Sequence, residues 1–103
     1  MDHAKVAGEV VEAVGGASNI SAAAHCATRL RLVIADQSKI NQQALDDNED
    51  LKGTFAAGGM FQIIVGPGDV ALVFSEMIRP GGVKEVSKDE AKEQAAKGGT
   101  PLS

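Results

Sequence analysis

The chain has 103 residues, carries a formal net charge of −4 and contains only three aromatic residues, all of them phenylalanine. This length predicts one domain that buries an aliphatic core without disulfides or a metal. Fourteen acidic residues against ten basic ones, together with so few aromatic rings, argue against nucleic acid as a partner.

The cysteine count and the hydropathy pattern bear on the compartment. A single cysteine cannot form an internal disulfide, which favours a reducing environment. The N-terminus lacks the basic start and apolar run of a signal peptide, and no apolar stretch approaches the roughly 18 residues of a membrane span. We therefore expect a soluble, cytoplasmic domain.

The first half of the chain predicts one helix followed by two strands. Valines recur every four positions over residues 3–14, which is the spacing of one helix face. Residues 19–25 and 29–35 predict the two strands, and apolar side chains alternate with other residues in the second strand. Because a strand directs alternate side chains to opposite faces, Arg29 and Arg31 must project from the same face.

The second half of the chain predicts a helix, a hairpin and a last helix. Ser38 is expected to cap a short helix over residues 38–46. Two strands over residues 51–56 and 60–65 flank a turn that contains two glycines, which is typical of a hairpin. An apolar stripe over residues 70–78 predicts the last helix.

The order of these elements predicts an α+β fold. Short connections favour antiparallel pairing, so we expect a four-stranded antiparallel sheet with three helices packed on one face and the other face open. We place this domain at residues 1–82. Residues 83–103 have almost no large apolar side chains and are expected to form a flexible linker or tail. Charges cancel in that tail, so His25, Arg29 and Arg31 form a local basic cluster in an acidic domain.

Cys26 lies where the first predicted strand ends and the second is about to begin. A thiol is a good nucleophile only as the thiolate, and nearby cations and amide N–H groups stabilise both a thiolate and a phosphoryl group attached to it. A turn at this point would direct the backbone N–H groups of Ala27, Thr28 and Arg29 at the sulfur. The two arginines offer forked hydrogen bonds to phosphate oxygens. We therefore expect Cys26 to carry a phosphoryl group, with no metal or cofactor.

Two further residues are candidates for this site. His25 could lower the pKa of the thiol when protonated or contact a partner, or it could be an ordinary strand-end residue. Gln62 lies on the arginine side of its predicted strand and could donate to phosphate, or it could be an ordinary polar residue of an open sheet face. One histidine with one cysteine does not make a metal site.

Three other interpretations of the cysteine compete with this one. A lone cysteine is often a small buried apolar residue. In tyrosine-phosphatase-type enzymes a His-Cys pair is followed after five spacers by arginine, but that position here is Leu32, and Arg31 falls one residue short. A thiol redox enzyme would need a second cysteine to resolve a mixed disulfide.

Five segments of the chain carry a resemblance to a known family. They are Gly15-Gly16, Asn19-Ile20, His25-Cys26-Ala27-Thr28-Arg29-Leu30-Arg31, Lys52-Gly53 and Phe61-Gln62-Ile63-Ile64-Val65-Gly66. In their order and spacing, over residues 3–80, the chain closely resembles the enzyme IIB domains of the bacterial sugar phosphotransferase system, glucose–sucrose family. The core motif Cys-x-Thr-Arg-Leu-Arg is highly specific to these domains.

The resemblance implies a protein-phosphocysteine–sugar phosphotransferase. Cys26 would accept a phosphoryl group from a phosphohistidine on a IIA domain and pass it to a sugar held by a membrane-embedded IIC domain. The family's phosphate-site residues match four positions here: Thr28, Arg29, Arg31 and Gln62. Residues 83–103 would begin the linker to the IIC domain, which would place this domain at the cytoplasmic side of the cell membrane.

The identity of the sugar depends on the IIC domain, because the cysteine site binds the phosphoryl group. The motifs are most similar to those of sucrose-type members, and trehalose-type members are close. The Gly-Pro-Gly turn also appears in N-acetylmuramate-type members. A lone domain of this kind could instead be a non-catalytic sensor or interaction module. For the IIA partner we expect an apolar rim around the cysteine turn, formed by Ala23, Ala24, Ala27 and Ile64.

Overall fold

The computed structural model describes residues 1–78. The predicted end of the domain at residue 82 and the predicted linker over residues 83–103 lie outside the described residues. Within the described part, no helix is long and apolar enough to cross a membrane.

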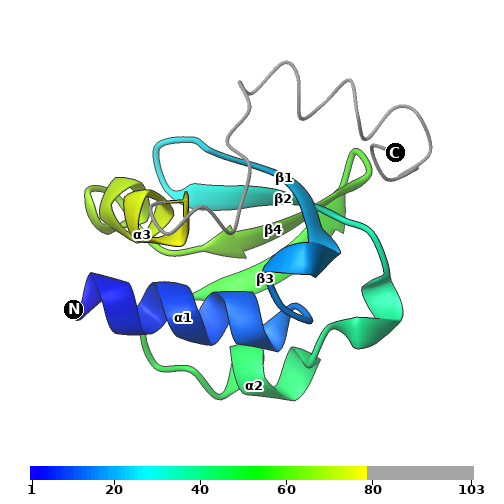
Figure 1. Ribbon diagram of the computed structural model, residues 1–103. Helices are drawn as coiled ribbons and strands as arrows, with labels where there is room; N and C mark the ends of the chain where they lie inside the picture. The colour runs from blue at the N-terminus through cyan, green and yellow to red at the C-terminus, as the bar shows by residue number, and fades with distance from the viewer. Residues whose placement is uncertain (79–103) are drawn as a thin grey trace.

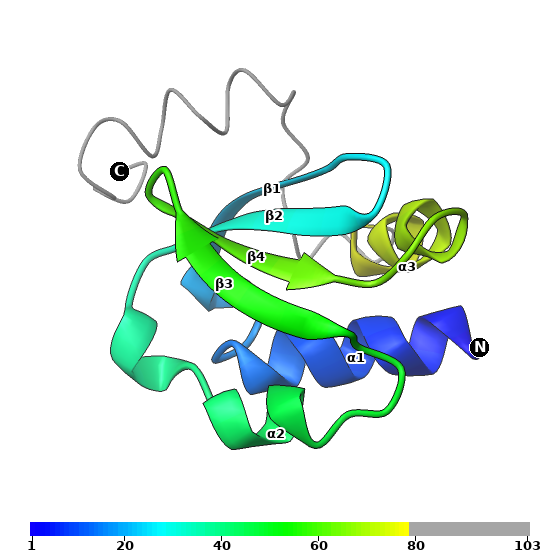
Figure 2. The same cartoon turned by 180° about the vertical axis from the view of Figure 1, so that it is seen from behind.

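The described chain alternates helices with pairs of strands in the predicted order. The helices are α1 (His3–Ala13), α2 (Gln42–Asp46) and α3 (Asp69–Ile78). The strands are β1 (Ile20–His25), β2 (Arg29–Ile34), β3 (Gly53–Ala57) and β4 (Met60–Ile64). Figure 1 shows the helices gathered on one side of the sheet, and Figure 2 shows the same arrangement from behind.

The sheet consists of two antiparallel hairpins joined along their inner strands. Its strand order is β1-β2-β4-β3, so β2 and β4 are central while β1 and β3 form the edges. Every neighbouring pair is antiparallel. The predicted α+β fold, with a four-stranded antiparallel sheet and three helices, is confirmed.

Local signals in the sequence account for both ends of α1. The Asp2 carboxylate accepts a hydrogen bond from the Lys5 amide and so satisfies one of the free N–H groups of the first turn. At the other end Gly15 and Gly16 adopt φ values of 100° and 95°, which residues with a Cβ rarely adopt. The Gly16 amide donates back to the Val11 carbonyl at 2.8 Å and closes the helix.

The predicted helix over residues 38–46 is wrong in its extent and in its cap. Residues Gln37–Lys39 form a separate 3-10 turn, in which the Asp36 carboxylate accepts from the Ser38 amide. Ile40 is extended, and α2 begins only after Asn41, whose side chain accepts from the Ala44 amide at 3.1 Å. Each capping side chain starts its own short turn, so one continuous helix does not form.

The core lies between the sheet and the helices and is almost entirely aliphatic. Alternation along β2 directs Leu30 and Leu32 into this core, where both are fully buried. The same alternation places Arg29 and Arg31 on the opposite face of the sheet. That second face is partly closed by small and flexible apolar side chains, which form a separate buried cluster of Ala22, Ala24, Val33 and Met60.

Candidate active site

Cys26 lies in the tight connection between β1 and β2, which we call the Cys26 loop (residues 26–28). The Cys26 amide donates to the Arg29 carbonyl at 2.9 Å, so the loop is a close hairpin turn. The Thr28 carbonyl accepts from the amides of Val65 and Gly66, at 2.9 and 3.0 Å. These bonds attach the loop to the end of β4, so the sulfur is held by two strands and not by a free loop.

Gly66 makes that attachment possible. Its φ of 122° lies in the region that favours glycine, and the chain turns there immediately after β4. A Cβ at this position would also lie 3.3 Å from Cε of Lys52. Backbone conformation and the nearby Lys52 side chain therefore explain why a glycine follows the Phe-Gln-Ile-Ile-Val motif.

The surroundings of the Cys26 sulfur favour the thiolate. Partial burial would by itself raise the pKa of this half-buried thiol. Hydrogen bonds from the backbone amides of Thr28 and Arg29 and from the Arg29 side chain, with the positive charge of Arg31, outweigh that effect. Together they lower the pKa of Cys26 from its ordinary value of 9.0 to about 6. At neutral pH most of the thiol is therefore ionised.

The sequence predicted amide donors from three residues of the loop. The structure places the Thr28 and Arg29 amides at the sulfur. Ala27 is the exposed tip of the loop, and its amide as a donor stays a prediction. Arg29 and Arg31 were predicted to project from the same face of the sheet, and both guanidinium groups act on the Cys26 sulfur.

Gln62 lies directly beside Arg31, because β2 and β4 pair these two residues across the sheet. The side chain of Gln62 is buried, with 5% exposed. Its Oε1, and Nε of both Arg29 and Arg31, are buried without a hydrogen-bond partner among the described residues. Buried polar atoms are normally paired, so this group of atoms has capacity to bind a ligand. The two unpaired Nε–H groups are donors, which suits an anion.

His25 is the last residue of β1 and directly precedes Cys26. Its ring packs against Phe74 of α3 with 4.7 Å between the ring centroids. Its Nδ1 is 3.1 Å from the carbonyl oxygen of Cys26, a contact with the loop backbone. The cations that lower the thiol pKa are Arg29 and Arg31. A modulating role for His25 stays a prediction. In this geometry His25 would act on the thiol through its contact with the loop backbone.

The predicted apolar rim for a IIA partner is wrong for two of its four residues. Ala23 is fully buried in the core under the helices, and Ala24 is 3% exposed within the cluster on the opposite face. Neither side chain therefore offers an exposed apolar surface to a partner. Ala27 is exposed at the loop tip and Ile64 is half-buried, so these two positions remain available.

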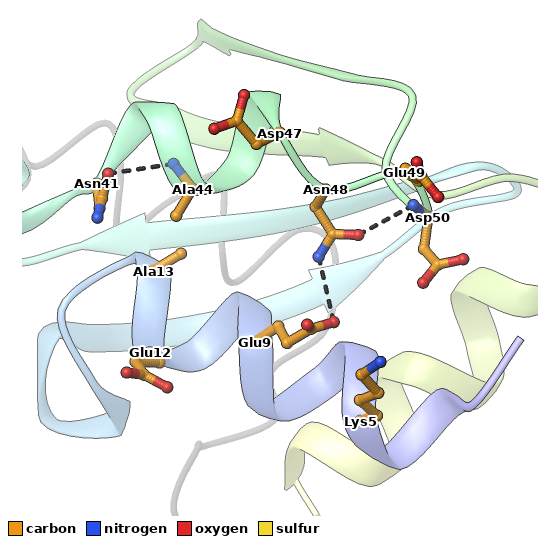
Figure 3. Close-up of a pocket in the computed structure, with 10 residues that line it drawn as sticks. All are labelled: Lys5, Glu9, Glu12, Ala13, Asn41, Ala44, Asp47, Asn48, Glu49 and Asp50. Carbon is orange, nitrogen blue, oxygen red and sulfur yellow. Dashed lines mark hydrogen bonds between the residues drawn. The ribbon is translucent and has the colours of Figure 1, made fainter.

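A surface groove beside α1 is not part of this site. It is a groove of about 420 Å³ between α1 and the α2 region, and it is lined mainly by acidic and amide side chains (Figure 3). Asn48 donates across it to the Glu9 carboxylate at 3.3 Å. Its carboxylates would repel a phosphoryl group, and no residue of the Cys26 loop lines it. The described residues contain no group of three or more histidine, cysteine or acidic side chains placed to hold a metal ion.

Phe55 also lies beside this group of residues, and no sequence motif pointed to it. Its ring centroid lies 5.3 Å from Cζ of Arg29, and it is one of three large apolar side chains that stay exposed in the described part of the chain. Hairpin register could have indicated it, since the turn at Gly58 and Gly59 pairs Phe55 with Gln62.

Comparison with known proteins defines the class of this domain. The model of the family described as phosphotransferase system, EIIB, matches residues 8–41. A solved structure of one domain of the PTS system IIabc component from Clostridium difficile is 37% identical, with a TM-score of 0.75. The match covers 84% of this chain and 88% of that one. The chain therefore belongs to the EIIB family of the phosphotransferase system.

Several relatives of the chain are proteins whose names state a sugar. The chain is 58% identical over 95% of its length to the sucrose-specific EIIBCA component of Pediococcus pentosaceus. It is 46% identical over 95% of its length to the trehalose-specific EIIBC component of Bacillus subtilis strain 168, and 43% identical over 99% to the sucrose-specific EIIBC component of Staphylococcus xylosus. The chain spans only 15% of the first of these proteins and 21% of each of the other two.

Proposed function

We propose that this chain is the phosphoryl carrier of a sugar-transporting phosphotransferase system. Cys26 accepts a phosphoryl group from a phosphohistidine of a IIA domain and donates it to a sugar held by a IIC membrane domain. The observation that carries this proposal is a half-buried thiol whose pKa is lowered to about 6 by two backbone amides and two arginines. Membership of the EIIB family supports it.

Acceptance is a displacement at phosphorus. The Cys26 thiolate attacks, the S–P bond forms, and the P–N bond to the donor imidazole breaks with its electron pair staying on nitrogen. No base is needed, because the thiol is already ionised at neutral pH. The amide and guanidinium donors that stabilised the thiolate are then positioned to bind the phosphoryl oxygens.

Delivery reverses the role of the sulfur. A sugar hydroxyl attacks phosphorus, its proton goes to a base of the acceptor domain, and the S–P bond breaks with the electron pair returning to sulfur. A thiolate of low pKa is a good leaving group, so the groups that lower the pKa of Cys26 also assist this step.

In this proposal each predicted site residue has a distinct task. Arg29 and Arg31 balance the charge on the moving phosphoryl group, and Thr28 provides its amide and hydroxyl. Ala27 provides a further amide at the loop tip. Gln62 lies beside Arg31 and provides an amide donor to a phosphoryl oxygen, while His25 supports the loop from the α3 side.

We propose sucrose as the sugar and the cytoplasmic face of the cell membrane as the place of action. Two of the three relatives described above are sucrose-specific by name, including the one at 58% identity. The trehalose-specific relative at 46% is the competing assignment. The phosphorylated domain should pass its phosphoryl group to sucrose on membranes that contain a sucrose-specific IIC domain. Faster transfer on trehalose-specific membranes would contradict the sucrose assignment.

The carrier function is tested by mass. Incubation with phosphoenolpyruvate, the general phosphotransferase proteins and a sucrose-system IIA domain should add about 80 Da, one phosphoryl group, at Cys26. Cys26→Ser, treated in parallel, should gain nothing. If the native chain gains no mass while a known IIB domain in the same mixture does, the carrier function is wrong. The chain would then be an interaction module.

A further inference from the structure

Phe55 is an exposed aromatic residue on the edge strand β3, with 37% of its surface exposed. Single exposed apolar side chains are common on protein surfaces, so the informative observation is the contact that the Phe55 ring makes. Of the three large apolar side chains exposed in the described region, Phe55 contacts a cation, the guanidinium of Arg29. Cζ of Arg29 lies 5.3 Å from the ring centroid, within the range of a cation–π interaction.

The sheet register explains how two strands that are not neighbours make this contact. Gln62 of β4 is paired with Arg31 on one side and with Phe55 on the other, so these three residues form one row across the sheet. Arg29 is paired with Ile64, one step along the same face. The ring of Phe55 therefore reaches diagonally over β4 to the guanidinium. The paired backbones of three strands set where Phe55 lies relative to Arg29, so the ring can support the guanidinium.

Arg29 needs such a support. An arginine side chain loses about 2 kcal/mol of rotamer entropy when it is held in one geometry. A carboxylate could hold it, but a carboxylate would also occupy its N–H groups and cancel its charge. No ion pair to Arg29 is present within residues 1–78. An aromatic face holds the guanidinium by its flat side and leaves the N–H groups at its edge free to donate.

We propose that Phe55 is a positioning residue for Arg29. Its ring holds the guanidinium so that the free N–H groups point to the Cys26 sulfur and to a phosphoryl group bound there. This inference rests on the proposed function for its catalytic consequence, but its structural content can be measured on the thiol alone. The part of the chain between Gly53 and Ala57 would thereby contribute to a site whose other residues belong to β2, β4 and the Cys26 loop.

The experiment measures the rate of Cys26 alkylation by iodoacetamide from pH 4.5 to 9. In Phe55→Leu we expect the midpoint of the rate profile to rise by about 0.4–0.7 pH unit. A shift of this size corresponds to the free energy of one exposed cation–π contact, which would no longer hold Arg29 beside the thiolate. Phe55→Tyr keeps an aromatic face, so this variant should have the same midpoint as the native chain. Leu72→Ala, which truncates an exposed apolar residue of α3, is the matched control and should leave it unchanged.

The charged groups near the sulfur are Arg29 and Arg31, and the titratable imidazole of His25 contacts the Cys26 carbonyl through Nδ1. The comparison is therefore repeated in a His25→Gln background, which removes the imidazole. The shift caused by Phe55→Leu should persist in the His25→Gln background.

The same pair of profiles in an Arg29→Ala background decides the mechanism. If Phe55 acts through Arg29, Phe55→Leu should produce no further shift once the guanidinium is gone. An equal shift with and without Arg29, or no shift in Phe55→Leu, would overturn the inference. Alkylation needs no phosphoryl donor, so a chain that shows the shift but never gains a phosphoryl group would keep this inference and lose the carrier function.

Discussion

The two faces of the sheet differ sharply although they are built from the same strands. On the helix side of β2, Leu30 and Leu32 are fully buried in an aliphatic core. One residue away along the same strand, Arg29 and Arg31 face the other side and keep buried Nε–H groups without partners. The residues of the helix face are buried in the core, whereas the opposite face holds N–H donors that remain available to an anion. Stability and chemistry are therefore expected to respond to different substitutions, even at adjacent positions.

The largest expected effect is on the chemistry of the second face. Cys26→Ser should reduce phosphoryl acceptance by more than about 10³-fold, because a hydroxyl is scarcely ionised at neutral pH and this site offers no base. At pH 5, where the thiol is protonated in both the folded and the unfolded chain, the free energy of unfolding should change by less than about 0.5 kcal/mol, since the side chain is half-buried at a turn. Mass spectrometry and urea unfolding measure the two quantities. A destabilisation above 2 kcal/mol would break the separation of the faces.

The reverse result is expected on the helix face. Leu32→Ala should lower the free energy of unfolding by about 2–5 kcal/mol, because it leaves a cavity in a core where Leu32 has no exposed surface. In the folded fraction the thiol should keep its native alkylation midpoint. Urea unfolding monitored by circular dichroism gives the first value and alkylation gives the second. A shifted midpoint would show that core packing positions the sulfur.

Arginine-to-lysine substitutions at residues 29 and 31 test whether the chemistry depends on the shape of the guanidinium as well as on its charge. Arg29→Lys should slow delivery to sugar by about 10–100-fold, since a charge-assisted hydrogen bond is worth about 1.5–3 kcal/mol and an ammonium cannot reproduce the planar fork. Acceptance from the IIA domain should be much less affected. Arg31→Lys should behave in the same way, and Leu30→Met is a core control. Normal transfer in both lysine variants would refute the forked-bond argument.

A smaller effect follows from the thiol pKa. The alkylation profile of the native chain should have its midpoint at about pH 6, whereas the urea-unfolded chain should titrate near the ordinary value. At pH 6 the folded chain should react about 15–30-fold faster, after allowance for the lower nucleophilicity of a less basic thiolate.

The same pKa has a signed consequence for stability. Because the pKa of Cys26 is lower in the folded state, its contribution is complete above the unfolded value of 9.0 and disappears as the pH falls through about 6. The difference in unfolding free energy between the native chain and Cys26→Ser should therefore increase from pH 5 to pH 9. A difference that decreases over this range would contradict the direction of the pKa shift.

The sequence predicted most elements because their signals are local. Alternation along residues 29–35 correctly separated the core-facing leucines from the arginines. The helix over residues 38–46 failed for a reason that is also local: two capping side chains, Asp36 and Asn41, each begin a turn of their own. The cap from Ser38 was plausible by residue type, but Ser38 instead donates its amide and hydroxyl to Asp36.

The alanines of β1 show a different limit of sequence analysis. Small side chains give no strong pattern, so the prediction placed Ala23 and Ala24 on an exposed rim. The structure buries them on opposite faces, because β1 is covered by the helices on one side and packs into a second cluster on the other. Burial of a small residue depends on its neighbours in space, and its own type contains little information about them.

Composition, the alternation of residues and the Cys-x-Thr-Arg-Leu-Arg motif were sufficient to determine the fold class and the family. Each depends on residues that are close in the chain. The pairing of Arg31 with Gln62, the attachment of Thr28 to Val65 and Gly66, and the contact between Phe55 and Arg29 were decided only in the tertiary structure. These contacts join β2 or the Cys26 loop to residues more than 25 positions away, and their geometry depends on strand order and register, which local patterns do not contain.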